Sequence, residues 1–530
     1  MAKSLFIEMS ILLMFLCLFL IIYFFNSMRV FFLILSCLYV NISIYSQSYN
    51  VNLDASLMKE YENIKMGRKV NITNVVHDVK FNGDKIEELY SVEIESQKIP
   101  IFAFDQFNIK YDNVQSLWDA LIIGKVLFPL QEKGMQSDLR KELEAETYEY
   151  ITRLRNYGLV LEDSYLENYI YSLIVKIAPS RLIDGRLNDI NVLILNDPTL
   201  NACIYSNGTL VIHTGLLSAL HSEDELVAVL SHEIAHFVLD HHIQNINKEI
   251  SRKKRAEFWG ALATGLTAVV EGVAASKNGN YVPGGATIGV AILSSVVASQ
   301  IVERMGQNYN IAQEEDADNV AKEILNFLGY DKNALATALN RIKDNMIVER
   351  NKQMYFQSYT HPSLVERIQK AGFPQDVSEA VYEKEISIAI SSVARLKYEF
   401  GRFKQSISLI DTNIKNGVAT VDDFVMKANC LLALYNDEIS NGEVLELIEK
   451  AKNIDNLNLN TYKLEIKAHI RLKNYTHALN LLNEYIDKLH QKDFFYIKNG
   501  NRIIGNTDYQ FIIKEKDEAK RMIMKLEKIK

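Results

Sequence analysis

The stretch "SHEIAHFVLDHH", Ser231–His242, contains four histidines and one glutamate in a chain of 530 residues that has only 11 histidines. His232, Glu233 and His236 form the pattern His-Glu-x-x-His. Side chains four positions apart on an α-helix differ by only about 40° in direction, so the two imidazoles can bind one metal ion. Glu233 is rotated away from them and can reach a water on that ion, which suits a general base.

This stretch is predicted to lie on a buried helix. Ser222 and Glu225 predict a capping box at its start. Apolar residues recur at helical spacing through the motif: Leu226, Val229, Leu230, Ile234, Phe237 and Val238. Because the surroundings are apolar, an exposed polar face that carries two histidines by chance is the less favoured interpretation.

A catalytic metal site needs a third protein ligand. On a continuous helix, His241 and His242 would point about 140° and 240° away from His236, so we expect neither to bind the ion. The acidic stretch "QEEDAD" lies on a second predicted helix, with Glu314 and Asp318 four positions apart on one face. Glu314 is the predicted third ligand, and Asp318 is predicted to orient a ligand histidine.

The predicted fold class is α+β. "DINVLILND", residues 189–197, reads as a buried strand. Asn207-Gly208 lies between two apolar, β-branched runs and predicts a hairpin whose two turn residues both have positive φ. The chain is therefore expected to contain a zincin-type domain, with helices and a small sheet with an edge hairpin, followed by an all-α helical-repeat domain.

Composition restricts the alternatives. The chain is 48% apolar and 23% charged, which indicates a globular protein. Its net charge of −8 and the absence of a basic run exclude a nucleic-acid-binding surface. Cys17 and Cys37 lie in the apolar N-terminus, and Cys203 and Cys430 are far apart, so we expect no disulfide framework and interpret the last two as core residues.

Residues 1–46 are interpreted as a signal peptide or an N-terminal membrane anchor. The first apolar run is long enough to cross a bilayer, although it contains Glu8. The second begins at Met28 and has the layout of a secretory signal, which favours translation from Met28 over a retained anchor. A lipoprotein site at Cys37 is disfavoured because the apolar run continues beyond it. We expect export in either case.

The remaining domain boundaries follow from changes in pattern. Residues 47–129 are expected to form an accessory α+β segment, residues 130–376 the metallopeptidase domain, and residues 377–530 tetratricopeptide-like repeats. Phe403 and Tyr475 stand in similar segments 72 residues apart, twice a 36-residue unit. A plain helical bundle is the alternative.

Two apolar segments, 256–275 and 285–302, form a predicted hairpin over residues 256–302. They are Gly-rich and short for a membrane span, and the first contains Glu271. We favour a hairpin that covers the active-site cleft or rests on a membrane over two true spans.

With these motifs identified, the sequence resembles the HtpX/BepA/Oma-type zinc metallopeptidases of peptidase family M48. The resemblance covers about residues 150–372. Its motifs are "HEIAH", the acidic run ending in "EEDAD", the hairpin with "NACIYSNGTLVIHTGLL", and "HPSLVERI", which spans His361–Ile368. An exported peptidase domain followed by tetratricopeptide-like repeats is most similar to the periplasmic BepA branch.

The resemblance implies roles for individual residues. His232, His236 and Glu314 would bind one Zn²⁺ per chain, Glu233 would be the general base, and Asp318 would support a ligand. It also implies that His361 is a reversible fourth ligand and that Arg367 lies nearby; alternatively, this motif is only a helix start with proline in its first turn.

The expected activity is hydrolysis of internal peptide bonds in unfolded or misassembled cell-envelope proteins, with Glu233 taking the proton of a zinc-bound water. Arg367 or His361 would stabilise the oxyanion. An extended substrate would add a strand beside the hairpin residues Ile204, Tyr205, Leu210, Val211 and Ile212.

Two alternatives remain. One is an integral-membrane, HtpX-like quality-control peptidase. The other is a largely non-proteolytic chaperone that docks on envelope assembly machinery through its repeats. Glu233 favours an enzyme, because zinc binding does not require it. Membrane contact and a periplasmic or envelope location fit all of these functions.

Overall fold

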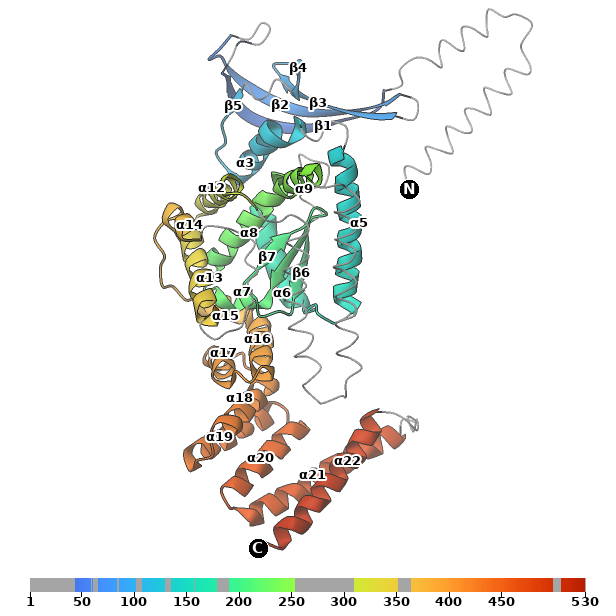
Figure 1. Cartoon of the computed structure of the whole chain (residues 1–530), viewed down its shortest axis with the longest axis vertical. Helices are drawn as coiled ribbons and strands as arrows, with labels where there is room; N and C mark the ends of the chain where they lie inside the picture. The colour runs from blue at the N-terminus through green and yellow to red at the C-terminus, as the bar shows by residue number, and fades with distance from the viewer. Residues whose placement is uncertain are drawn as a thin grey trace, which may run out of the picture. The chain divides into compact units, whose positions relative to one another are not determined.

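The computed structural model describes residues 43–58, 60, 65–82, 85–101, 107–128, 135–156, 158–178, 190–252, 309–350, 364–498 and 507–529 (Figure 1). The chain divides into two compact units, each described by itself below. The first comprises residues 1–109 and 127–131, and the second residues 110–126 and 132–530. Residues 1–42 of the predicted signal or anchor and the predicted apolar hairpin lie outside the described residues.

The first unit contains a five-stranded antiparallel sheet in the order β4-β3-β2-β1-β5. Its strands are β1 (Ser43–Leu57), β2 (Lys69–Asn82), β3 (Lys85–Ile94), β4 (Gln97–Pro100) and β5 (Phe107–Ile109). Leu53, Ala55 and Leu57 alternate with more exposed residues, so these positions of β1 bury one face. Glu95 and Ser96 both have positive φ in the two-residue turn between β3 and β4, a geometry that matches strand twist.

The second unit contains a smaller sheet in the order β6-β8-β7. Its strands are β6 (Asn191–Leu195), β7 (Ala202–Ile204) and β8 (Thr209–His213). β8 is parallel to β6 and antiparallel to β7. Every residue of β8 is buried, which is consistent with the three consecutive apolar residues at its centre, Leu210–Ile212.

The predicted hairpin is present between β7 and β8, but its turn differs from the prediction. Only Gly208 has positive φ, and Asn207 does not. The Gly208 N–H donates to the Tyr205 carbonyl at 2.9 Å, and the Tyr205 N–H donates to the Thr209 carbonyl at 2.9 Å. These bonds describe a turn followed by one left-handed residue, so a single glycine is sufficient.

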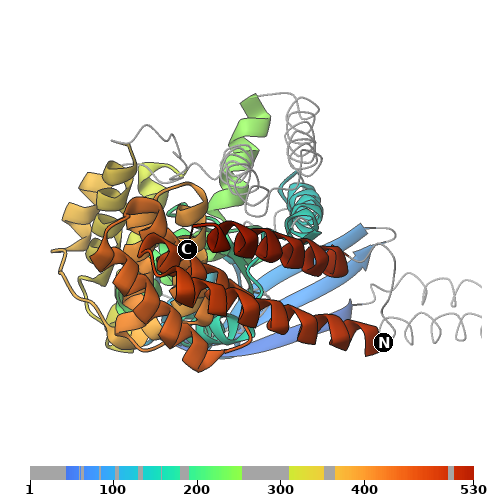
Figure 2. The ribbon, with the colours of Figure 1, turned by 90° about the horizontal axis from the view of Figure 1, so that it is seen from below.

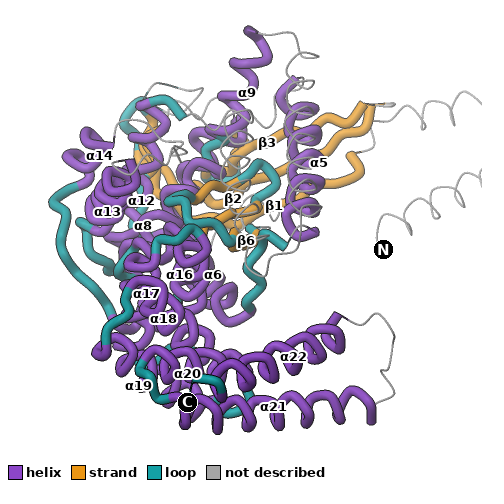
Figure 3. Tube along the Cα trace, turned by 60° about the horizontal axis from the view of Figure 1, so that its bottom comes forward, coloured by secondary structure: helices purple, strands orange, loops and turns teal. Residues whose placement is uncertain are grey.

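Helices precede, separate and follow these strands in the part of the second unit up to residue 371 (Figure 3). They are α3 (Val114–Leu121), the π-helix η2 (Ile122–Val126), α5 (Met135–Asn156), α6 (Ser164–Ile177), α7 (Thr214–Ala219), α8 (Glu223–Val238), α9 (His241–Arg252), α12 (Ile311–Leu328), α13 (Ala334–Arg350) and α14 (Leu364–Ala371). α8 is buried along its whole length from Glu225 to Val238 and packs against α12, α13 and β7. The central helix therefore has no solvent-exposed face on which the motif could lie.

The ends of the two central helices follow their local sequence in most respects. Ser222 caps α8 by accepting the Glu225 N–H, as predicted. The Glu225 carboxylate does not complete a capping box, because it accepts the His221 N–H at 3.0 Å and pairs with Arg341 at 3.0 Å. Gly329 ends α12 with φ +76°.

The C-terminal part of the second unit is entirely helical within its described residues (Figure 2). Its helices are α15 (Ala380–Glu385), α16 (Ser387–Glu399), α17 (Phe403–Lys415), α18 (Val421–Leu434), α19 (Glu438–Ile454), α20 (Leu459–Arg471), α21 (Tyr475–Lys498) and α22 (Thr507–Glu527). From α16 onward each helix packs against the next, with fully buried alanines such as Ala428, Ala451 and Ala468 between them. The α+β prediction with an all-α C-terminal region is confirmed.

Hydrogen bonds and packing of α16 on α7 join these helices to the part of the unit that contains the small sheet. The buried Tyr382 hydroxyl donates to the Leu217 carbonyl at 2.9 Å, and the Glu379 N–H donates to the His221 carbonyl at 2.8 Å. Within the described ranges, no helix combines the length and apolar character that crossing a bilayer requires.

Candidate metal centre

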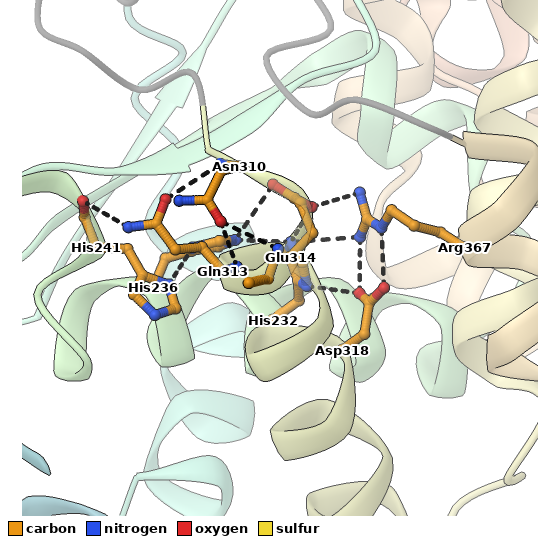
Figure 4. A network of polar contacts seen from close by, with 9 residues as sticks. His232, His236, His241, Asn310, Gln313, Glu314, Asp318 and Arg367 are labelled. Atoms are coloured by element: carbon orange, nitrogen blue, oxygen red, sulfur yellow. Dashed lines mark hydrogen bonds and ion pairs between the residues drawn. The ribbon is translucent and has the colours of Figure 1, made fainter. Parts of the chain in front are cut away.

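The structure brings three metal-binding side chains together between α8 and α12 (Figure 4). The Nε2 atoms of His232 and His236 are 3.1 Å apart. Glu314 reaches them from α12, with one carboxylate oxygen 3.6 Å from His232 Nε2 and the other 3.7 Å from His236 Nε2. All three residues are at least 96% buried, so their donor atoms converge in a site of low dielectric constant.

The outer nitrogens of both rings are already engaged. His232 Nδ1 lies 2.9 Å from a carboxylate oxygen of Asp318, and His236 Nδ1 lies 2.8 Å from His241 Nδ1. A hydrogen bond from His232 Nδ1–H to Asp318 leaves the Nε2 lone pair directed at Glu314. The two Nε2 atoms are so close that at most one proton can lie between them. When a metal ion displaces that proton, His232, His236 and the Glu314 carboxylate all present electron pairs to the same point. This donor set fits a divalent metal ion.

Arg367, on α14, holds the two carboxylates of α12. Its Nε and one Nη donate to Asp318 at 2.9 and 2.7 Å, and its other Nη lies 2.7 Å from Glu314. Burial alone would raise the pKa of Asp318, but the bonds from His232 and Arg367 outweigh burial and hold that pKa well below its usual range. Asp318 is therefore ionised at neutral pH and can keep accepting a proton from His232.

Glu233 lies beside this cluster and is 3% exposed. Together with His232, Arg367 and Asn201 it lines a cavity of about 20 Å³, which is large enough for one water molecule. A second cavity, of about 260 Å³, is lined by Glu314, Arg367 and other residues of α12 and α14. The cluster is thus buried but borders space that small molecules or a chain segment can enter.

Two neighbours of His236 were not predicted from the sequence. α8 ends at Val238, and Asp240 has a φ of +58°, so the chain turns before His241. On a continuous helix His241 would point about 140° away from His236, so the contact between the two rings was not predicted. Burial lowers the pKa of His241 to about 4, which keeps its ring neutral. Tyr309 stacks on His236 with ring centroids 3.6 Å apart, and no motif marked it.

The predicted substrate-strand residues occupy different positions in the small sheet. Ile204 lies on β7, Tyr205 begins the turn, and the other three, Leu210, Val211 and Ile212, lie on β8. β8 is hydrogen-bonded on both sides, so among the described strands of this hairpin only β7 can present an edge. His361 lies outside the described residues. Cys203 and Cys430 are buried and form no disulfide bond, as expected of core cysteines.

Comparison with known proteins agrees with this geometry. Residues 166–372 match the model of peptidase family M48. A Vibrio cholerae relative is 28% identical over 199 residues, which are 37% of this chain and 36% of the relative. The beta-barrel assembly-enhancing protease of Escherichia coli is 24% identical over 212 residues, 40% of this chain and 39% of its own length. The mitochondrial metalloendopeptidase OMA1 of Arabidopsis thaliana is 37% identical over 59 residues, 11% of this chain and 12% of its own. The similarity thus spans about two fifths of the first two relatives.

Proposed function

We propose, from the premise that residues 166–372 form a peptidase domain of family M48, that this chain is a zinc-dependent endopeptidase. The observation that carries the proposal is the convergence of His232, His236 and Glu314, with Glu233 beside them at a water-sized cavity. A purely structural metal site is usually closed by four protein ligands and needs no adjacent buried glutamate.

The donor set favours zinc, which two imidazoles and one carboxylate bind in many hydrolases. When bound, zinc would supply a Lewis acid that brings the pKa of a coordinated water toward neutrality. Glu233 would accept the proton of the attacking water and later transfer it to the leaving amine. His241 and Asp318 would hold the two imidazoles in orientation through the ring nitrogens that face away from the ion.

We assign Arg367 a positioning role rather than contact with the oxyanion. Its side chain is 5% exposed, and its donors already engage Asp318 and Glu314. A donor that stabilises a transition state must be directed at the position of the reacting oxygen. The contacts of Arg367 instead support the carboxylates that orient or form the metal site.

An extended substrate would pair with β7, whose residues Ala202–Ile204 lead directly from the loop that lines the cavity beside Glu233. Backbone pairing of this kind selects unfolded chains more than particular side chains. The three relatives are all named as proteases or endopeptidases, and those of Vibrio cholerae and Escherichia coli are named as enhancing beta-barrel assembly. We therefore propose unfolded or misassembled cell-envelope proteins as substrates, an exported location, and docking of the C-terminal helices on a partner in that compartment.

The test is Glu233→Gln in the full chain. This variant should keep wild-type circular dichroism and bound zinc but cleave a labelled unfolded protein such as casein more slowly by about 10²–10⁴-fold, the usual contribution of a general base. Glu315→Gln is the matched control, because Glu315 neighbours Glu314 but its side chain is 51% exposed, and its activity should be unchanged. Wild-type cleavage by Glu233→Gln would refute the enzymatic proposal and leave a binding or chaperone function.

A further inference from the structure

A second group of metal-binding side chains lies far along the chain from the first, on the C-terminal helices. Glu465 and His469 are four positions apart on α20, and His477 lies in the first turn of α21. One ligand atom from each lies within 4.8 Å of the other two. The rings of His469 and His477 have centroids 4.3 Å apart and an interplanar angle of 62°. Like the first cluster, this one joins two side chains of one helix to a third from its neighbour.

The packing of α20 against α21 fixes this arrangement. The chain reverses between the helices at Lys473, which has a φ of +59°, so the end of α20 lies beside the start of α21. Beneath the cluster, Ile466 and Ala478 are buried in the core shared by both helices. His469 Nδ1 is inaccessible to solvent and has no hydrogen-bond partner among the described residues. Such a buried nitrogen is destabilising unless a bound group compensates it.

We propose that Glu465, His469 and His477 bind a divalent transition-metal ion such as Zn²⁺, Ni²⁺ or Cu²⁺. Two imidazoles and one carboxylate select these ions over Mg²⁺ or Ca²⁺, which prefer oxygen ligands. Water completes the coordination sphere, so this site binds more weakly than a four-ligand structural site. The ion links α20 to α21 and stabilises the helical hairpin that they form.

One charge beside the cluster opposes metal binding. Lys452 on α19 is the opposing charge, because it forms an ion pair with Glu465. Its ammonium also lies 3.9 Å from the centroid of the Tyr462 ring. Lys452 therefore retains a partner when Glu465 turns to the metal, and it reduces the affinity of the site rather than closing it.

The test measures zinc bound to the untagged full chain by elemental analysis after dialysis against buffered zinc. Wild type should hold one zinc more than His477→Ala, whose substituted side chain is exposed and outside the core. His490→Ala is the control, since His490 lies on the same helix but outside the cluster, and it should match wild type. His232→Ala disrupts the first site. The double variant His232→Ala/His477→Ala should hold one zinc fewer than His232→Ala alone.

A separate measurement concerns Lys452. Lys452→Met should bind zinc at the second site more tightly than wild type, because a positive charge beside Glu465 is removed.

Zinc should also raise the melting temperature of wild type more than that of His477→Ala. Equal zinc content in wild type and His477→Ala, with both proteins folded by circular dichroism, would overturn the proposal and leave the two histidines as a packed pair.

Discussion

Replacing Arg367 with lysine should weaken both the fold and metal binding, because lysine keeps the charge but not the fork of donors. Arg367 makes two contacts with Asp318 and one with Glu314, all between 2.7 and 2.9 Å. A hydrogen bond to a charged group contributes about 1.5–3 kcal/mol. One ammonium group cannot reproduce the planar, bidentate contact with Asp318.

The expected loss follows from this geometry. If lysine retains one of the three contacts, the two lost contacts correspond to about 3–6 kcal/mol in the free energy of unfolding of the metal-free protein. This overlaps the range of about 3–5 kcal/mol for breaking a buried ion pair. Asp318 would then orient His232 less well, and zinc affinity should fall by about 10–100-fold, as is usual when a residue supporting a ligand is lost.

Urea unfolding in the presence of a chelator measures the first quantity, and competition with a chromophoric chelator measures the second. Lys370→Met is the matched control, because Lys370 lies on the same helix and pairs with Glu315 at 3.3 Å while both side chains are more than half exposed. An exposed pair of this kind contributes about 0–1 kcal/mol. The positioning role is refuted if Arg367→Lys keeps wild-type stability and zinc affinity while kcat alone falls, since that result indicates a contact with the transition state.

Three further predictions follow from residues around the centre. Gly215→Ala should cost about 1–3 kcal/mol of unfolding free energy in urea titrations, because an added Cβ would lie 2.3 Å from backbone atoms of the preceding loop. Burial alone would raise the pKa of Asp197, but bonding to His213 brings that pKa below its usual value. The ionised Asp197 therefore stabilises the fold above about pH 4, and this contribution is lost as the pH falls further. The difference in unfolding free energy between wild type and Asp197→Asn should shrink from pH 7 to pH 3, and a constant difference would contradict a lowered pKa of Asp197. His241→Phe should lower zinc affinity by about 10–100-fold in chelator competition, because His236 loses the partner of its Nδ1 atom, and unchanged affinity would show that this contact does not orient the ligand.

The sequence predicted two pairs of site residues, each separated by about one turn on its own helix, and predicted that the two helices meet at the metal. The spacing of His232 and His236, and of Glu314 and Asp318, places each pair on one helix face, and the structure shows both pairs facing each other across α8 and α12. Helical periodicity is a local property of the backbone, and so it can be read from the residues themselves. Gly329 and the hairpin after Ile204 were predictable for the same reason.

Tertiary packing decided what local spacing does not contain. The break at Asp240 returns His241 to His236, and a helix that starts at Leu364 brings Arg367 onto both carboxylates of α12. The position of β8 inside its sheet leaves β7 as the available edge of the hairpin. The sequence alone therefore determined which side chains could form a metal site and on which helices they lie. Their distances and supporting partners depend on contacts between segments tens to more than a hundred residues apart, and only the folded chain brings those segments together.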